Sequence, residues 1–341
     1  QFDQDFSNDS GNATLAYQSA SADSSAPFAI FAAWALIGTV GQAGSRVRSL
    51  GTGLLMALAY LARSDGLLLL AVPLLCLALP LRPGRAADQA DRQPDGPQRA
   101  WPGRPSPANL VYVFAAFGLV IAPWLVRNTL ALGTPLPGSV LKQAWLSDYV
   151  QTFNYLAPAT PRTLLAQGWP AILSLRGQAL FDGARVFLLS TFPWGLLALP
   201  GAWLLRRRWR TYPHLVYGLL LFAGLALVFP VASMSGTIYH SQGAIFPFAA
   251  LAAVYAVYRA VLALLPRPRQ TGIVLAILLG GVLVLSLSQA WSARTAVGER
   301  HQAEQAQYGA IARWLGQRAA PSDVVMTTQP YSVRWASGHP C

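Results

Sequence analysis

TGIVLAILLGGVLVLSLSQA, residues 271–290, is an apolar run that contains no charged side chain. A helix that crosses the hydrocarbon core of a bilayer needs about 20 such residues. Because a backbone in lipid must satisfy its own hydrogen bonds, this run predicts a transmembrane helix. Seven more apolar runs precede it, and none of them alternates in the manner of a barrel strand. They cover residues 27–43, 50–62, 66–81, 108–126, 184–205, 213–232 and 244–265.

The composition of the 341-residue chain also indicates a membrane protein. Hydrophobic residues make up 54% and charged residues only 11%, whereas soluble domains carry about 25% charged residues. Collagen, coiled coil, intrinsic disorder and a disulfide scaffold are excluded by this composition. Cys76 and Cys341 are too few for a Cys/His zinc site. We therefore expect an all-α polytopic membrane protein with about eight transmembrane helices.

Basic residues gather in every second loop between the apolar runs, which predicts the orientation of the chain. Short loops rich in Arg and Lys remain on the cytoplasmic side, so both termini are expected on the outer face. The net charge of +12 is then a topology signal, and we expect no nucleic-acid partner. The loops that carry it hold Arg46, Arg48, Arg82, Arg85, Arg92, Arg99, Arg104, Arg206, Arg207, Arg208, Arg210, Arg267 and Arg269.

Three regions are expected along the chain. Residues 1–25 form an outer N-terminal segment, residues 26–290 form the transmembrane bundle, and residues 291–341 begin an outer soluble domain. Within the bundle, residues 82–107 are rich in Pro, Gly, Gln and Asp and predict an inside linker without regular structure. The chain does not start with Met, and it stops just after a strand-like segment. We therefore expect it to be a fragment of a longer protein.

Two outer segments carry further structure. Residues 127–182 form a long outer loop in which the amphipathic runs 140–151 and 162–179 predict helices on the membrane surface. This loop either covers a substrate or only supplies interfacial aromatic residues. After the last span, residues 299–318 have helical spacing, and residues 324–328, VVMTT, predict a buried strand. A helix followed by a strand suggests the start of an outer α/β domain.

Arg63 and Asp65 interrupt two apolar runs. The run before them, residues 50–62, covers about 20 Å as a helix, which is less than the hydrocarbon core of about 30 Å. Both residues are therefore expected at or slightly below the outer membrane surface. Ionisable groups at that depth are costly and usually functional. The alternative is a pair that caps a hairpin and reaches water.

Four more residues are candidates for the outer face. Arg127 and Asn128 end the fourth apolar run, and Arg127 together with Arg63 could bind phosphate oxygens through the guanidinium fork. By itself, Arg127 would be an interfacial anchor. Tyr239 and His240 lie on an expected short outer loop, where a histidine can position a phosphate or a sugar. A surface histidine without a role is the alternative.

The order of these motifs resembles a known family. LARSDG (61–66) is followed by PWLVRNTLALGTP (123–135), by the histidine-bearing loop, and by a tail with PSDVVM (321–326). This order is similar to the bacterial relatives of the protein O-mannosyltransferases and lipid A aminoarabinose transferases. Those proteins are multi-spanning glycosyltransferases of the GT-C fold that use a polyprenyl-phosphate sugar. The resemblance covers most of the chain.

The resemblance implies a GT-C-like helical bundle in the inner (plasma) membrane. It implies transfer of a sugar from a polyprenyl-phosphate-linked donor to an acceptor glycan, lipid or protein on the outer face, in contact with membrane lipid. The substrate-binding residues implied are Arg63, Asp65, Arg127, Asn128, Tyr239 and His240.

The resemblance leaves the catalytic residue unassigned. The family carries its catalytic acid in the first large outer loop, and none of Asp3, Asp5, Asp9 and Asp23 has a matching context, so this acid is expected outside the fragment. A divalent metal ion stays open as a cofactor. Two other classes also stay open, namely a transporter or flippase and a non-catalytic cell-envelope assembly protein.

Overall fold

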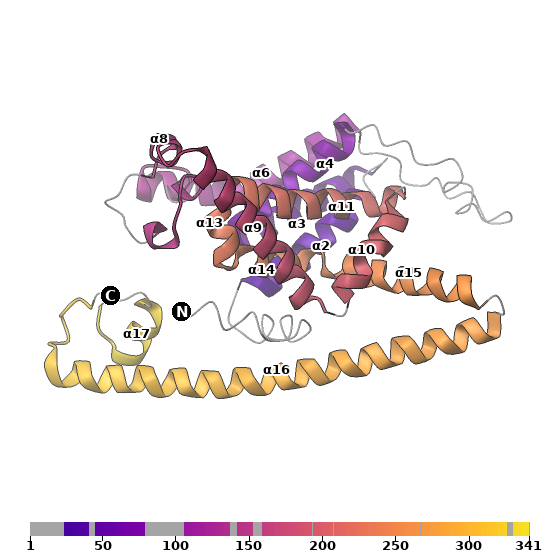
Figure 1. Ribbon diagram of the computed structural model, residues 1–341. Coiled ribbons are helices and arrows are strands. Elements are labelled where there is room, and N and C mark those ends of the chain that lie inside the picture. Colours follow the sequence, from indigo (N-terminus) through magenta and orange to yellow (C-terminus); the bar gives the residue numbers. More distant parts are fainter. Residues whose placement is uncertain are drawn as a thin grey trace.

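The structure is a computed structural model in which every regular element of the described residues is a helix (Figure 1). The described residues are 24–40, 45–78, 106–136, 142–152, 159–192, 194–206, 208–265, 268–325 and 330–340. The expected linker 82–107 and the N-terminal segment 1–25 therefore lie almost wholly outside the described residues. The all-α prediction is confirmed for the residues that are described.

The described residues up to Leu132 form four helices and one short 3-10 turn. Local signals explain several of their boundaries: the Ser45 and Ser106 side chains accept hydrogen bonds from the backbone of the first turns of α3 and α6, as N-cap residues do. Gly133 ends α6 in the left-handed conformation (φ 72°), which glycine adopts without steric cost. The elements are α2 (Ser25–Val40), α3 (Arg46–Ala62), η2 (Ser64–Leu67), α4 (Leu68–Ala78) and α6 (Pro107–Leu132).

The described residues after Leu132 form shorter and less regular elements, because several helices change direction or loosen along their length. Two π-helical turns, η5 (Leu220–Gly224) and η6 (Ser233–Thr237), interrupt it. The other elements are η3 (Tyr149–Thr152), α8 (Pro161–Leu165), α9 (Trp169–Ser190), α10 (Trp194–Leu205), η4 (Trp209–Thr211), α11 (Tyr212–Leu219), α12 (Leu225–Val228), α13 (Pro230–Ala232), α14 (Ile238–Ser241), η7 (Gln242–Ala244), α15 (Phe246–Leu264), α16 (Pro268–Arg318) and α17 (Pro330–Ser337).

Among the described residues, three helical segments are long and apolar enough to cross a membrane: Pro107–Leu132, Phe246–Leu264 and Gln270–Ser292. Two bent pairs raise this number to five if each counts as one span: α9 with α10, bent by 106°, and Tyr212–Val228 with Pro230–Ala244, bent by 116°. The helices Ser25–Val40 and Ser64–Ala78 are apolar but shorter. The chain therefore has the helices of a membrane protein, and the count of eight spans stays a prediction.

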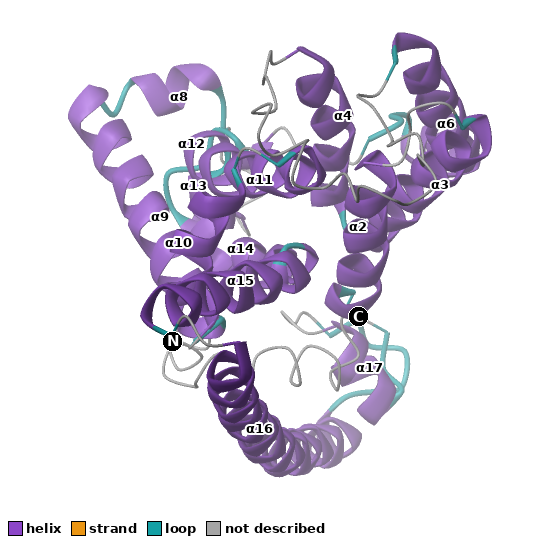
Figure 2. Ribbon diagram, turned by 90° about the vertical axis from the view of Figure 1, so that its right-hand side faces the viewer, coloured by secondary structure: helices purple, strands orange, loops and turns teal. Residues whose placement is uncertain are grey.

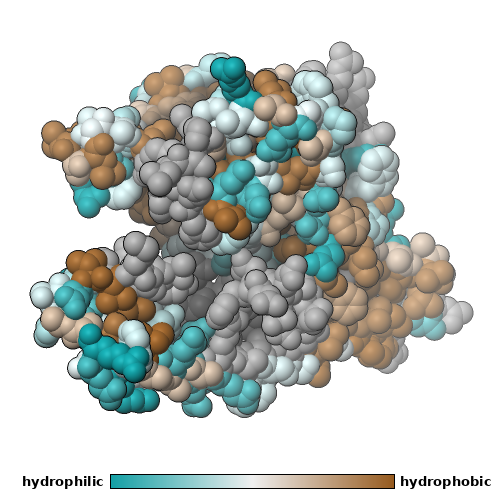
Figure 3. Space-filling model, turned by 60° about the vertical axis from the view of Figure 1, so that its left-hand side comes forward, coloured by the Kyte–Doolittle hydropathy of each residue, from teal (hydrophilic) through white to brown (hydrophobic). Residues whose placement is uncertain are grey.

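The helices pack around one main hydrophobic core. Its buried residues come from α2, α3, α4, α6 and the segment 212–245, and Figure 2 shows these helices grouped on one side of α15. A smaller core joins α10 to α15 through Ala198, Leu205, Ala249 and Ala252. Large apolar side chains are also exposed on many helices, and Figure 3 shows patches of hydrophobic residues on one face, the broadest of them at its lower right. Lipid-facing helices expose such side chains because hydrocarbon tails take the place of water.

Two expectations for the outer segments are revised. Residues 162–179 do not form a separate surface helix, because α9 runs from Trp169 into the apolar stretch that follows. In the expected helix 140–151, the described residues begin at Lys142; Lys142 and Gln143 are helical, and turns and η3 follow them, so no continuous helix runs over residues 142–151.

The expected strand is not seen in the described part of the tail. Val324 and Val325 have no strand structure, and Val325 makes one backbone hydrogen bond to Pro340. Residues 326–328 of the expected strand lie outside the described residues. The tail that is described consists of the far half of α16 with α17 packed on it, so an outer α/β domain stays a prediction.

Candidate functional site

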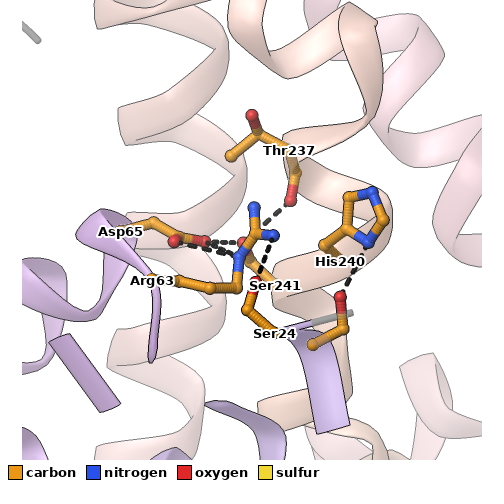
Figure 4. A network of polar contacts seen from close by, with 7 residues as sticks. Ser24, Arg63, Asp65, Thr237, His240 and Ser241 are labelled. Carbon is orange, nitrogen blue, oxygen red and sulfur yellow. Dashed lines mark hydrogen bonds and ion pairs between the residues drawn. The ribbon is translucent and has the colours of Figure 1, made fainter. Parts of the chain in front are cut away.

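A cluster of polar side chains lies inside the helical body, where three segments far apart in the sequence meet (Figure 4). Ser24 and Ser25 come from the start of α2, Arg63 and Asp65 from the break between α3 and α4, and the rest of the cluster from η6 and α14. Buried polar groups are costly unless they bond to one another. We refer to Ser24, Ser25, Arg63, Asp65, Thr237, His240 and Ser241 as the polar cluster.

Arg63 and Asp65 form the centre of the polar cluster. Nε of Arg63 lies 3.2 Å from Oδ1 of Asp65, and the two side chains are only 16% and 8% exposed. Nη1 of Arg63 also donates to the Ser24 hydroxyl at 3.5 Å. These bonds leave other N–H groups of the guanidinium, which has five, for a further acceptor.

The backbone around this pair depends on a glycine. Arg63 ends α3 with an extended backbone, and its carbonyl accepts the N–H of Gly66 at 2.9 Å. A Cβ on Gly66 would lie 2.6 Å from the backbone nitrogen of Tyr60. Only glycine therefore allows η2 to fold back tightly against the last turn of α3, and this fold places Asp65 beside Arg63.

His240 joins the cluster from inside the helical body, and not from a loop as the sequence suggested. It lies in α14, directly after the π-helical turn η6, in which Gly236 has a positive φ of 104°. Nδ1 of His240 lies 2.7 Å from the Ser25 hydroxyl. The next residue, Ser241, hydrogen-bonds to Asp65 and to the carbonyl of Thr237, the latter at 2.8 Å. His240 and Ser241 therefore tie α14 to both other segments.

Tyr217 lies next to the polar cluster from α11. Its side chain is fully buried, close enough to Asp65 and Arg63 to interact with them electrostatically. Its hydroxyl has no hydrogen-bond partner within the part of the chain that the structure describes. A buried hydroxyl without a partner costs free energy, so this position favours a ligand or a water molecule that accepts or donates a hydrogen bond.

Of the three other residues that the sequence suggested, Tyr239 borders the polar cluster, whereas Arg127 and Asn128 do not. Tyr239 packs edge-on against the ring of His240, with 5.3 Å between centroids, and so borders the cluster. Arg127 lies elsewhere: it is exposed, its guanidinium lies over the ring of Trp124, and it donates to Asn128 at 3.4 Å. Asn128 is buried and donates to the carbonyl of Pro135 at 3.3 Å.

The separation of Arg127 from Arg63 follows from the path of α6. The ring of Phe117 on this helix contacts Tyr60, near the end of α3. α6 then continues for about 15 Å to reach Arg127. The described contacts thus bring together Arg63, Asp65 and His240 with Tyr239 at their edge, and they do not join Arg127 to this group.

Sequence reasoning missed Ser24, Ser25, Tyr217, Thr237 and Ser241. Serine and threonine are common in any apolar span, so their position in the sequence carried no signal of a shared site. The described residues contain no group of three or more His, Cys, Asp or Glu side chains that could hold a metal ion.

Comparisons with known proteins give no match to a family model, to a curated protein or to a solved structure.

Proposed function

We propose that this chain is part of a polytopic glycosyltransferase of the inner (plasma) membrane. It would transfer a sugar from a polyprenyl-phosphate-linked donor to an acceptor on the outer face. The observation that carries the proposal is the guanidinium of Arg63, which is held inside an apolar helical body by Asp65 and Ser24 and keeps further N–H donors. A fixed guanidinium of this kind suits a phosphate that must be bound next to hydrocarbon.

The residues of the polar cluster suggest distinct roles in such a transfer. In the reaction, the bond between the anomeric carbon and the phosphate oxygen breaks, and the phosphate leaves with an additional negative charge. Arg63 would stabilise that charge, because a preorganised cation away from water acts strongly on it. Asp65 and Ser24 would hold Arg63 in position. The Tyr217 hydroxyl and His240 would lie near the phosphate or the sugar.

The acceptor hydroxyl must also lose a proton, which requires a general base. Asp65 is the acidic residue of the polar cluster, and it is engaged by Arg63 and Ser241. We therefore assign Asp65 to positioning and assign the base to none of the described residues. A divalent metal ion remains an open part of the proposal.

A donor titration tests the proposal. The chain, within its full-length protein, is purified in nanodiscs, and binding of a long-chain polyprenyl phosphate is measured for wild type, Arg63→Lys and Arg63→Ala. Lysine keeps the charge but loses the fork, so affinity should fall for Lys and fall further for Ala. Arg185→Ala is the matched control, because Arg185 also pairs with a carboxylate, Asp182, but at an exposed site. Wild-type affinity for Arg63→Ala would overturn the phosphate role.

One observation favours a second candidate, a transporter or flippase. The segment 212–244 is bent by 116°, and Ser235 and Gly236 inside it have non-helical backbone angles. Discontinuous helices beside buried charges are typical of substrate sites in transporters. Release of free polyprenyl phosphate from a sugar-linked donor supports the transferase. Movement of the intact donor between leaflets, without its cleavage, supports the transporter.

A further inference from the structure

Arg208 and Arg259 direct their guanidinium groups to the same hydroxyl, that of Tyr255. Nη2 of Arg208 lies 3.2 Å from the Tyr255 oxygen, and Nη1 of Arg259 lies 3.3 Å from it. Arg208 follows the end of α10, whereas Tyr255 and Arg259 are one turn apart on α15. Two cations held around one atom repel each other, and this arrangement is costly unless a nearby negative charge offsets the repulsion.

The surrounding sequence does not supply that negative charge. Residues 183–298 contain nine arginines and no Asp or Glu. In the described part of the chain, the two ion pairs are those of Asp65 with Arg63 and of Asp182 with Arg185. The arginines around Tyr255 therefore lack a carboxylate partner among the described residues, and an external anion is the natural counter-charge.

The hydroxyl of Tyr255 adds a third donor at this point. Guanidinium groups only donate hydrogen bonds, so the Tyr255 oxygen accepts from both arginines. Its own O–H hydrogen is used by neither of them. An anion next to the hydroxyl can thus accept from Arg208, Arg259 and Tyr255 together, which suits the several oxygens of a phosphate group.

The three residues are held in place by the packing of α10 on α15. A Cβ on Gly201 would overlap the carbonyl of Ala252, so the glycine allows the two backbones to touch one turn away from Tyr255. The turn after α10 is also fixed, because the buried Thr211 hydroxyl bonds to the carbonyls of Leu205 and Arg208, each at 2.8 Å. Arg208 therefore belongs to a structured turn.

The surface next to these residues is apolar. Trp203, at the end of α10, is 64% exposed, and the guanidinium of Arg206 lies 3.6 Å from the centre of its ring. Aromatic and basic residues together are typical of the headgroup depth of a bilayer. Leu199 on α10 and Leu251 on α15 are each 59% exposed. A ligand here would have an anionic head and apolar tails alongside the helices.

We propose that Arg208, Tyr255 and Arg259 form a headgroup site for an anionic phospholipid. The lipid belongs to the leaflet at the ends of α10 and α15 where Arg206, Arg208 and Arg259 gather. Its phosphate accepts hydrogen bonds from the two arginines and the tyrosine, and its acyl chains lie along the exposed leucines. This site is separate from the polar cluster, and it does not depend on the proposed transferase activity.

Lipid binding to the purified chain, measured by native mass spectrometry in a neutral detergent, tests this site. Phosphatidylglycerol should bind more tightly than phosphatidylcholine with the same acyl chains. Each of Arg208→Gln and Arg259→Gln should weaken phosphatidylglycerol binding about fivefold, the effect expected of one basic residue at a membrane surface. Tyr255→Phe keeps the ring but removes the third donor, and it should weaken binding less.

Arg294→Gln is the matched control, because Arg294 is exposed and lies over Trp291 but has no second arginine at a shared hydroxyl among the described residues. The control should bind phosphatidylglycerol as wild type does. An equal loss in the control, or equal binding of the two lipids by wild type, would overturn the site. Soluble glycerophosphoglycerol carries the same headgroup without acyl chains. If it competes at the concentration of the lipid, the site binds phosphate without any preference for a lipid, and the proposal that its ligand is a phospholipid is wrong. If Arg208→Gln does not fold, the test uses Arg259→Gln alone, because Arg259 lies on an exposed helix face.

Discussion

Ser25 and His240 are 215 positions apart, and the Ser25 hydroxyl lies 2.7 Å from Nδ1 of the His240 ring. Ser25 is fully buried in the first turn of α2, and His240 lies on α14 after a bent and partly π-helical segment. This bond fixes the start of α2 against the most irregular part of the fold. It also decides which way the imidazole ring faces within the polar cluster.

The first prediction concerns this pair. His240→Ala and Ser25→Ala should each lower the free energy of unfolding by about 1 kcal/mol, because each removes one partner of a hydrogen bond. The double variant should cost less than the sum of the two, since the bond is lost only once. Unfolding in denaturing detergent, followed by tryptophan fluorescence, measures all three variants. Strictly additive losses would mean that the two side chains do not interact.

The activity of His240→Ala separates structure from function. If His240 contacts the donor, this variant should lose turnover, whereas Ser25→Ala, with a similar loss of stability, should retain most of it. Equal turnover in the two variants would leave His240 with a purely structural role.

The second prediction separates the stability of the Arg63–Asp65 pair from ligand binding. Removing one partner, as in Arg63→Met, leaves a buried carboxylate without its cation and should cost about 3–5 kcal/mol. Replacing both, as in Arg63→Met with Asp65→Leu, should recover most of that stability, because an apolar pair avoids the cost of burying charge. The recovered protein should still fail to bind polyprenyl phosphate. Binding at the wild-type level would contradict the role of Arg63.

The third prediction uses two glycines with opposite surroundings. Gly66→Ala would place a Cβ 2.6 Å from the Tyr60 nitrogen, whereas a Cβ added to Gly118 in α6 would meet no atom within 4 Å. Gly66→Ala should destabilise the protein by about 1–3 kcal/mol through overpacking. Gly118→Ala should be neutral or stabilise it by up to about 1 kcal/mol through helix propensity. Thermal unfolding of both variants checks this, and a neutral Gly66→Ala would mean that η2 is not tightly packed on α3.

The fourth prediction concerns orientation in the membrane. Single cysteines at Ala87 and Thr160 are introduced into a variant in which Cys76 and Cys341 are replaced by alanine. Position 160 should react with a membrane-impermeant thiol reagent in intact cells. The basic loops are expected on the cytoplasmic side, which places the loop that contains residue 160 on the outer side. Position 87 should react only after the membrane is permeabilised. Equal labelling of the two positions in intact cells would rule out the predicted topology.

Much of the helical content followed from the sequence, because apolar composition and backbone hydrogen bonding leave a membrane chain few alternatives. The run 108–126 was recognised within α6, and the run 244–265 is nearly coextensive with α15. Bends were not predicted. The sharp turns near Phe192 and Phe229 occur inside or beside apolar sequence, where composition alone does not mark a change of direction.

The candidate site was predicted in part. Arg63 and Asp65 were found because charges stand out in an apolar sequence, and His240 because histidines are few. Their convergence depends on the packing of α2 and α14 against the break after α3, and local patterns do not encode packing over such sequence distances. Arg127 was grouped with Arg63 because both were expected to end a span, but α6 extends well past the point where it contacts α3.

α16 was expected as two helices and is one, 51 residues long. No proline occurs between its apolar and polar halves, so the backbone has no reason to break there. A straight helix of this length measures about 76 Å, of which the apolar segment Gln270–Ser292 accounts for about 35 Å. Once that segment is in the bilayer, the remainder acts as a rigid spacer of about 39 Å. The distance of α17 from the membrane is thus set by the number of residues between Ser292 and Arg318. A change in the tilt of the segment inside the bilayer would move the far end of α16 by a larger distance.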